Sequence, residues 1–395
     1  MKILFIHNRY QYRGGEDTTL EMESALLLSK GHEVKILEFN NDQLSSIFSK
    51  ITGGLRAVYN SQSASIVEKE ISNYNPDIIH VHNLFFTASP SVLYKARQMK
   101  IPVVMTVQNY RLMCANALLL RDQQICELCI NKVLPLAGVK YKCYRSSYIE
   151  SALVTGITGI HKLLSSWEKK VNTYIVPSEF LKNKLNNTFL KLPKSKVVVK
   201  PNFVKDIPAE KTNREDFFLF IGRLSTEKGI TTLLKCFTTT PSLKLVIAGD
   251  GPDKDTVLSY TRTASNITYL GQQPKEKVLE LMRKCKALLF PSIWYEGLPL
   301  TIIEAFATGT PVIASNLGAM TEMIQNEYNG FYFSPGNVDE LRNKILYLAD
   351  NVERYEHLYS NARATYLKKY HPDVHYTSIM RIYQMAITDN YSSHV

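Results

Sequence analysis

The sequence lacks long apolar runs, short-period repeats and low-complexity tracts. No stretch approaches the roughly 20 apolar residues that a membrane-spanning helix needs. The apolar run Ile3–Ile6 near the N-terminus stops at His7, so we expect no secretory signal peptide. We therefore expect a protein that is made and kept in the cytoplasm, where disulfides are rare.

Cysteine is also scarce, with 6 among 395 residues, yet most of it lies in one short segment. Cys126 and Cys129 have the C-x2-C spacing of a zinc knuckle, and Cys114 and Cys143 lie on either side of them. Two interpretations stay open for these four residues, which are a structural zinc site or separate reduced thiols.

The composition is that of a globular protein, with 45% hydrophobic and 21% charged residues, and the length predicts about two domains. The net charge of +11 is concentrated in residues 1–200, which carry 26 Lys and Arg against 15 Asp and Glu. Such a half is suited to nucleic acid or to an anionic lipid surface. Solvated surface helices are the alternative.

Two series of strands and helices follow one another along the chain, which predicts an α/β protein with parallel sheets. In the first half the expected strands are Lys2–Ile6, Glu33–Glu38, Asp77–His82, Ile101–Val107, Thr173–Pro177 and Lys196–Lys200. In the second half they are Phe217–Ile221, Lys244–Ala248, Ile267–Leu270, Ala287–Phe290, Thr310–Ser315 and Gly330–Phe333. We expect domains at residues 1–203 and 214–373, a linker at 204–213, and a final helix in 374–395 that packs on the first domain.

The segment from Phe290 to Ile324 carries two carboxylates eight residues apart, Glu296 and Glu304. Gly297 and Leu298 follow the first of them, and the spacing predicts a helix over Pro299–Ala307. The backbone N–H groups near Leu300 and Thr301 would then point out of the helix N-terminus, which is a ready site for phosphate. This arrangement suits a ligand with sugar hydroxyls at both ends and a diphosphate between them. The alternative is a helix with one core-facing and one solvated glutamate.

Two cations follow the first strand of the second domain. Arg223 and Lys228 lie five residues apart in a turn framed by Gly222 and Gly229. Positive charges there are placed to take the negative charge that develops on a leaving diphosphate. A helix start with solvated charges is the other interpretation.

A glycine pair, Gly14 and Gly15, lies between the first strand and the first helix, where backbone amides could approach a phosphate. By itself a glycine pair also fits a plain tight turn.

These motifs together resemble those of one family. The pattern Glu296-x7-Glu304 with Ala305, Ala307, Gly309 and Pro311 after it resembles the donor site of the retaining family-4 glycosyltransferases. The block G-R-x-x-x-E-K-G at residues 222–229 is similar to the block that this family carries. The resemblance implies the GT-B fold, in which two Rossmann-like domains face each other across a cleft.

The resemblance also implies roles for individual residues. Glu304 would hold the ribose hydroxyls and Glu296 the hydroxyls of the donor sugar. Arg223 and Lys228 would bind the diphosphate, and the Gly14-Gly15 loop would lie opposite it. Gln108 stands where relatives commonly have a histidine facing the donor sugar, so an acid–base role at this position is in doubt, although Gln108 still offers hydrogen bonds.

Three further features each allow a structural explanation. Asp253-Lys254-Asp255 resembles a metal-binding D-x-D motif, but we expect it to begin a surface helix. His80 and His82 fit either a ligand site at a strand end or a structural pair. The segment Tyr148–Trp167 mixes apolar and basic residues, and either lies in a membrane interface or packs on the sheet, which we favour.

The sequence therefore predicts a retaining glycosyltransferase with a UDP- or GDP-sugar donor and a saccharide or lipid-linked acceptor in cell-surface polysaccharide biosynthesis. We expect no metal requirement, no nucleic-acid partner, and peripheral contact with an anionic membrane. Two alternatives stay open, a sugar-nucleotide epimerase of the same fold and a non-catalytic partner subunit. The intact Arg223, Lys228, Glu296 and Glu304 argue against the second.

Overall fold

The computed structural model describes residues 1–9, 14–40, 58–208, 214–351 and 353–392, with side chains up to residue 390. The chain divides into two compact units. The first consists of Met1–Leu119, Cys126–Pro201 and His375–Val395, and the second of Leu120–Ile125 and Asn202–Val374. Among the described residues, no helix has both the length and the hydropathy to cross a bilayer.

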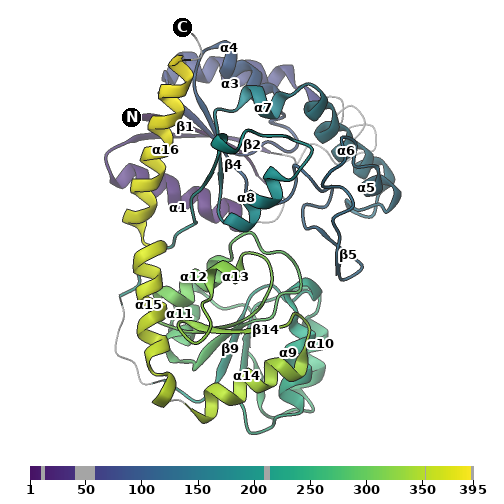
Figure 1. The fold of residues 1–395 in the computed structure, drawn as a ribbon, viewed down its shortest axis with the longest axis vertical. Coiled ribbons are helices and arrows are strands. Elements are labelled where there is room, and N and C mark those ends of the chain that lie inside the picture. The colour runs from purple at the N-terminus through teal and green to yellow at the C-terminus, as the bar shows by residue number, and fades with distance from the viewer. Residues whose placement is uncertain (10–13, 41–57, 209–213, 352, 393–395) are drawn as a thin grey trace. The chain divides into compact units, whose positions relative to one another are not determined.

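The first unit is built on a six-stranded parallel sheet with the strand order β2-β1-β3-β4-β7-β8 (Figure 1). Its strands are β1 (Lys2–Arg9), β2 (Glu33–Asn40), β3 (Ile78–Asn83), β4 (Val103–Thr106), β7 (Thr173–Val176) and β8 (Val197–Val199). Its helices are α1 (Gly15–Ser29), α3 (Ser61–Tyr74), α4 (Ser91–Gln98), α5 (Leu136–Lys140), α6 (Tyr148–Leu163), α7 (Ser166–Lys170) and α8 (Glu179–Asn186). A one-turn helix, η1 (Lys194–Lys196), leads into β8.

The C-terminal helix α16 (Pro372–Ser392) completes the core of the first unit. Its side chains Ile379, Ile382 and Tyr383 are buried in one cluster with Ile3 and Phe5 of β1. The Tyr383 hydroxyl lies 2.7 Å from His80 Nδ1. The chain thus returns to its first unit after the second, as the resemblance to GT-B proteins implies.

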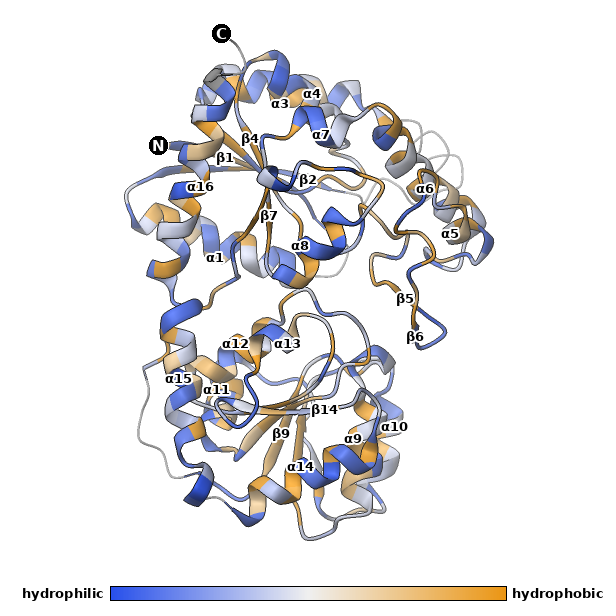
Figure 2. Ribbon diagram, in the orientation of Figure 1, coloured by the Kyte–Doolittle hydropathy of each residue, from blue (hydrophilic) through white to orange (hydrophobic). Residues whose placement is uncertain are grey.

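The second unit has six parallel strands in the order β11-β10-β9-β12-β13-β14. This is the 3-2-1-4-5-6 order of a dinucleotide-binding Rossmann sheet, so its switch point lies between β9 and β12. The strands are β9 (Phe218–Ile221), β10 (Leu245–Ala248), β11 (Ile267–Tyr269), β12 (Ala287–Phe290), β13 (Val312–Ser315) and β14 (Gly330–Phe333). In Figure 2 the labelled strand β9 lies toward the hydrophobic end of the colour scale, as expected of a strand covered on both faces.

Helices cover both faces of the second sheet, and a buried apolar cluster lies on each face. The helices are α9 (Ile230–Thr238), α10 (Lys254–Thr261), α11 (Lys275–Lys284), α12 (Leu300–Ala307), α13 (Met320–Met323), α14 (Val338–Asp350) and α15 (His357–Lys369). The second unit also has the one-turn helices η2 (Thr226–Lys228) and η3 (Glu353–Tyr355). The short strand β5 (Leu120–Arg121) pairs with β6 (Gln124–Ile125) in a hairpin.

The predicted strands are all present, with shifts at their ends, and both sheets are parallel. Pro299 is the residue before α12 rather than its first residue, because its ψ of 119° is extended. Of the expected linker at 204–213, residues 209–213 lie outside the described residues. Val204 and Ile207 are buried in the core of the second unit, so this part of the expected linker packs as part of that unit.

Candidate functional site

A buried carboxylate, Glu296, lies in the loop after β12 with three donors on one of its oxygens. Glu296 Oε1 accepts hydrogen bonds from Lys228 Nζ at 2.7 Å, Ser292 Oγ at 2.7 Å and Trp294 Nε1 at 2.9 Å. Among the described residues, no hydrogen bond goes to Oε2. The second oxygen of a rigidly held carboxylate is therefore available to accept from a ligand hydroxyl.

The side chain of Lys228 is held at this carboxylate by aromatic rings as well. Its Nζ lies 5.4 Å from the centroid of the Trp294 ring and 5.7 Å from that of Phe290. About a quarter of the side chain remains exposed, against 7% for that of Glu296. The ammonium group is thus positioned by its neighbours and still reachable by an anion.

A close backbone contact brings the loop after β9 to the loop after β12. Gly229 has a φ of 71°, and a Cβ added to it would meet the carbonyl oxygen of Pro291 at 2.0 Å. A side chain at this position would push the two loops apart and separate Lys228 from Glu296. The glycine that ends the motif 222–229 is therefore required by packing.

The loop after β10 supports the same motif from the other side. Leu224 N donates to the Asp250 carbonyl at 2.9 Å, and Asp253 N donates to the Leu224 carbonyl at 2.9 Å. A Cβ at Gly249 would meet the Gly222 carbonyl oxygen at 1.9 Å. Asp253 precedes α10 and Asp255 lies in its first turn, so the D-x-D lookalike begins a helix as predicted.

The second glutamate of the motif, Glu304, lies on α12 and forms an ion pair with Lys275 at the start of α11. The N-terminus of α12 is formed by Leu300 and Thr301, both partly exposed. Their N–H groups belong to the first turn and so have no carbonyl acceptor within the helix. Leu298, before the helix, is buried, whereas Gly297 is partly exposed.

Arg223 is the exposed cation of the set. Within the described part of the chain its guanidinium makes no hydrogen bond or ion pair, and Gly222 before it is partly exposed. The structure thus brings Lys228 into contact with Glu296 and leaves Arg223 and Glu304 outside that contact. An unpaired surface guanidinium is suited to a ligand phosphate.

The remaining predicted residues lie together in the first unit, at the start of α1. Thr19 Oγ1 donates to the Gly15 carbonyl at 2.9 Å and lies 3.4 Å from Gln108 Oε1. Gly14 caps the helix in an extended conformation, and its N–H donates to Asp17 Oδ2 at 2.8 Å. A Cβ added at Gly14 or Gly15 would meet no atom within 4 Å, so packing does not require glycine at either position.

Sequence reasoning missed the residues that hold these groups in place. Ser292, Trp294 and Glu296 lie two residues apart in turn, so in an extended loop their side chains fall on one side. That spacing is the signal that could have identified Ser292 and Trp294. Lys275 has no such signal, because it comes from another helix.

A second polar cluster is buried in the first unit around Glu23 of α1. Its Oε2 lies 2.9 Å from Lys200 Nζ and 3.0 Å from His375 Nε2, and its Oε1 lies 3.1 Å from His80 Nδ1. Burial alone would raise the pKa of Glu23, but the Lys200 and His80 charges and the hydrogen bonds hold the pKa well below its usual range. Burial lowers the pKa of His82, in the same cluster, to about 4.

This cluster explains the histidine pair. Both ring nitrogens of His80 are engaged, Nδ1 by Tyr383 and Nε2 by the Thr106 hydroxyl at 2.7 Å. Among the described residues, Glu23, His80 and His82 form the one group of three whose ligand atoms all lie within 4.8 Å of one another. Because Lys200 already neutralises the carboxylate, we interpret the group as a structural ion-pair network.

The four cysteines of the zinc prediction lie in the first unit and are not joined by disulfides. Burial and, to a smaller extent, the nearby thiols of Cys114, Cys143 and Cys126 raise the pKa of the Cys129 thiol to about 11. In the described structure their sulfurs do not form a group within 4.8 Å. The zinc site stays a prediction.

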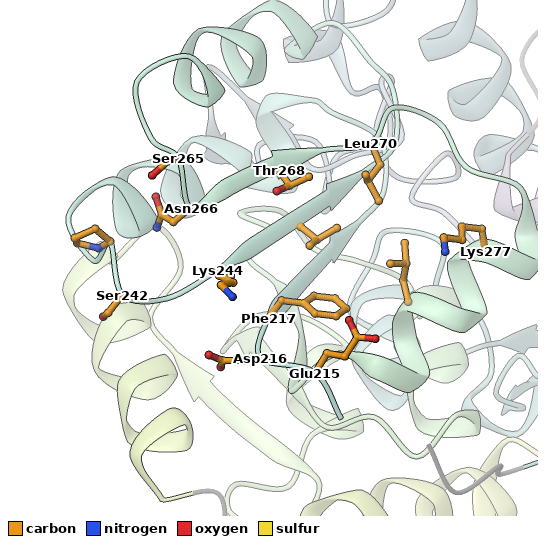
Figure 3. A pocket seen from close by; sticks show the side chains of 13 residues that line it. Glu215, Asp216, Phe217, Ser242, Lys244, Ser265, Asn266, Thr268, Leu270 and Lys277 are labelled. Atoms are coloured by element: carbon orange, nitrogen blue, oxygen red, sulfur yellow. The ribbon is translucent and has the colours of Figure 1, made fainter. Parts of the chain in front are cut away.

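A cavity of about 800 Å³ lies at the opposite edge of the second sheet (Figure 3). Phe217, Lys244 and Asn266, which line it, each directly precede a strand. Ligands of open α/β sheets bind outside the carboxyl ends of the strands, where Lys228 and Glu296 lie. The cavity contains none of the predicted site residues.

Comparison with known proteins agrees with this geometry. Residues 204–365 match the family described as glycosyl transferases group 1, and residues 13–206 match glycosyltransferase family 4. The chain belongs to the group 1 glycosyltransferases. It is 25% identical over 91% of its length to the whole of an uncharacterized 42.6 kDa protein in the cps region of Klebsiella pneumoniae.

Two further proteins are similar to this glycosyltransferase, one in the sequence of part of the chain and the other in its fold. The lipopolysaccharide 1,6-galactosyltransferase of Escherichia coli is 27% identical over 56% of this chain and 65% of its own. The Anabaena protein HepE, crystallised in complex with UDP, has a TM-score of 0.68 at 16% identity, covering 97% of this chain and 99% of its own. The fold is therefore GT-B, with two Rossmann-like units.

Proposed function

We propose that this glycosyltransferase moves a sugar from a nucleotide-sugar donor, a UDP- or GDP-sugar, to a saccharide or lipid-linked saccharide acceptor with retention of configuration. The names of its relatives support a role in cell-surface polysaccharide biosynthesis, because one lies in a cps region and another acts on lipopolysaccharide. The UDP complex of HepE supports a uridine donor.

The observation that carries this proposal is the convergence of Lys228, Ser292 and Trp294 on one oxygen of the buried Glu296. A carboxylate fixed in this way has its second oxygen available for hydroxyl groups of the donor sugar. Glu304, on the flank of α12, is proposed to hold the ribose hydroxyls. The N–H groups of Leu300 and Thr301 are proposed to donate to the diphosphate between them.

Catalysis in this proposal is electrostatic. Arg223 and Lys228 stabilise the negative charge that develops on the diphosphate as the bond between the sugar C1 and the phosphate oxygen breaks. The acceptor oxygen bonds to C1 on the same face, and its proton passes to the departing phosphate oxygen. Because two cations serve the diphosphate, we propose that the transfer requires no metal ion.

The first unit is proposed to bind the acceptor, since it carries the excess positive charge of residues 1–200. We propose that Gly14, Gly15 and Gln108 act in donor binding. A lipid-linked acceptor would also place the protein in contact with an anionic membrane.

The test is the release of nucleotide from a panel of UDP- and GDP-sugars, with and without a membrane extract as the source of acceptor. Wild-type protein should release nucleotide from one donor only when the extract is present. Lys228→Ala should lower this rate by about 10²–10³, the effect of losing one transition-state donor. Glu296→Gln should lower the rate as well, because it removes the carboxylate charge that holds Lys228 and the donor sugar.

Lys277→Ala is the matched control, because Lys277 forms an exposed ion pair with Glu280 at 2.9 Å in the same unit. This variant should keep the wild-type rate, since exposed pairs contribute little. Undiminished transfer by Lys228→Ala would contradict the site, and donor turnover without any acceptor would instead support an epimerase.

A further inference from the structure

Helix α6 of the first unit exposes four of its large apolar side chains. Those of Leu163, Tyr148 and Ile149 are 64%, 55% and 49% exposed, and Ile160 is exposed as well. Ile149, Leu153, Gly156, Ile160 and Leu163 follow one another at three or four residues, so they form one stripe along the helix. Leu164 directly after the helix is 58% exposed.

The opposite face of α6 is buried although its side chains are mostly small or polar. Thr155, Thr158 and Gly159 point into the unit, and a Cβ at Gly159 would meet Leu134 Cδ2 at 2.4 Å. His161 Nε2 donates to the Val58 carbonyl at 2.7 Å, and its Nδ1 is hydrogen-bonded to Ser166 Oγ at 2.8 Å. Val154 and Ile157 are the apolar residues of this buried face, so α6 carries apolar side chains on both of its faces. A surface helix of a water-soluble protein keeps its large apolar residues mainly on the buried face.

The apolar surface extends beyond α6. Among the residues that the structure describes, nine of the seventeen large hydrophobic side chains that are exposed lie between Leu128 and Leu164. Leu136 at the start of α5 is 63% exposed, and Leu134 and Tyr141 are exposed beside it. Figure 2 shows α5 and α6 together at one end of the first unit. We use the name α5–α6 face for the exposed apolar residues Leu134, Leu136, Tyr141, Tyr148, Ile149, Ile160, Leu163 and Leu164.

Basic residues accompany the α5–α6 face. Residues 128–170 contain seven Lys and Arg against two Glu. Lys132, Lys140, Lys142, Arg145 and Lys169 are exposed, and Lys142 Nζ lies 4.5 Å from the ring centroid of Tyr148. One of the two glutamates, Glu150, is close to Arg145, at 3.8 Å. The apolar stripe is therefore bordered by a net excess of positive charge.

We propose that the α5–α6 face docks on an anionic lipid bilayer, with α6 lying in the interface and its stripe turned toward the acyl chains. Exposed apolar patches of this kind mark contact surfaces, and a bilayer accepts leucine, isoleucine and tyrosine side chains together with a basic border. Negative headgroups complement the lysines and Arg145. The inference rests on the proposed function, in which the acceptor is bound to a membrane lipid, and it assigns the contact to named residues.

The experiment measures binding to phosphatidylcholine vesicles with and without phosphatidylglycerol, by sedimentation at low salt. Wild-type protein should sediment with the anionic vesicles. Ile149→Glu with Leu163→Glu should weaken binding about 100-fold, because each buried side chain contributes on the order of tenfold. Lys140→Gln with Lys142→Gln should weaken binding to the anionic vesicles about 25-fold, fivefold for each charge.

Leu28→Glu on α1 is the matched control, because Leu28 is 54% exposed in the same unit but lies outside the α5–α6 face. This variant should bind vesicles as the wild type does. Circular dichroism melting should show that every variant is folded. Equal sedimentation of Ile149→Glu/Leu163→Glu and wild type, or no sedimentation of the wild type, would overturn the proposal.

Two measurements separate this inference from the proposed function and from self-association. Stabilisation by UDP or GDP in a thermal shift assay should persist in Ile149→Glu/Leu163→Glu, while Lys228→Ala should lose it and still bind vesicles. If the face instead binds a second copy of the chain, sedimentation velocity without lipid will show a dimer that Leu163→Glu dissociates, which would contradict bilayer docking.

Discussion

Among single residues, Glu23 shows how a charge is kept inside the first unit. It lies between Leu20 and Leu27 on the buried face of α1, and its carboxylate is fully buried. The charge is compensated by Lys200, which follows β8, and by His375 of α16. A glutamate at an apolar position of a helix is a signal that the sequence contains, but its partners come from segments far away in the chain.

Glu23→Gln should destabilise the first unit by about 3–5 kcal/mol, because it leaves the Lys200 ammonium buried without a counter-charge. Urea unfolding checks this loss of stability when it is monitored by the fluorescence of Trp167 in a Trp294→Phe background. Trp167 is buried in the first unit, and the chain has only these two tryptophans.

Glu179→Gln serves as the control, because Glu179 is exposed and its ion pair with Lys182 is long at 3.8 Å. The double variant Glu23→Leu/Lys200→Met should recover part of the lost stability, since neither charge then remains buried. A Glu23→Gln protein as stable as wild type would show that the network contributes nothing.

For helices and strands, the sequence was most informative where a run of buried residues is bounded by glycine. The strands β9 and β10, which are followed by Gly222 and Gly249, have this pattern, and so does α12 between Pro299 and Gly309. The helices α3, α4 and α8 were not predicted. The turn between β5 and β6 was missed because Asp122 and Gln123, with φ of 50° and 61°, occupy positions where glycine or asparagine is the usual signal.

The orientation of α6 could not be read from residue spacing. Apolar residues occur around the helix, and the structure buries Val154 and Ile157 while it exposes Ile149, Ile160 and Leu163. The contacts of Gly159 and His161 lie on the buried face. In the candidate site, likewise, the pairing of Lys228 with Glu296 could be anticipated, while that of Lys275 with Glu304 depends on how α11 meets α12.

The segment from Cys114 to Cys143 gives a prediction about metal content. If the four cysteines bind zinc, purified protein should contain one zinc ion per chain by mass spectrometry, and Cys126→Ser/Cys129→Ser should contain none. Bound zinc would favour the thiolate of Cys129, whose pKa burial raises to about 11 in the absence of a metal.

Cys236→Ala is the control. Cys236 is buried in the second unit, so its replacement should not change the zinc content. Zinc-free wild-type protein, prepared without chelators, would favour separate reduced thiols.

In the whole molecule, the first unit is discontinuous in sequence. Its sheet is formed before residue 200, whereas Ile379, Ile382 and Tyr383 in its core come from α16. Tyr383→Ala should therefore destabilise the first unit by about 3–5 kcal/mol, as expected for a buried aromatic side chain. The fluorescence of Trp167 should report this loss, and that of Trp294 should not.

Met385→Ala provides the comparison, since Met385 is 42% exposed on the same helix. It should unfold at the urea concentration of the wild type. Equal loss in both units after Tyr383→Ala would contradict the assignment of this helix to the first unit.

The return of α16 to the first unit also fixes an order of events during protein synthesis. The ribosome makes the first sheet, then residues 202–374 of the second unit, and only afterwards the helix that closes the first core. Domains usually fold as they emerge, the N-terminal one first. Here the second unit has nearly all of its chain before the first does, so we expect the N-terminal sheet to wait, incomplete, until its last helix leaves the ribosome.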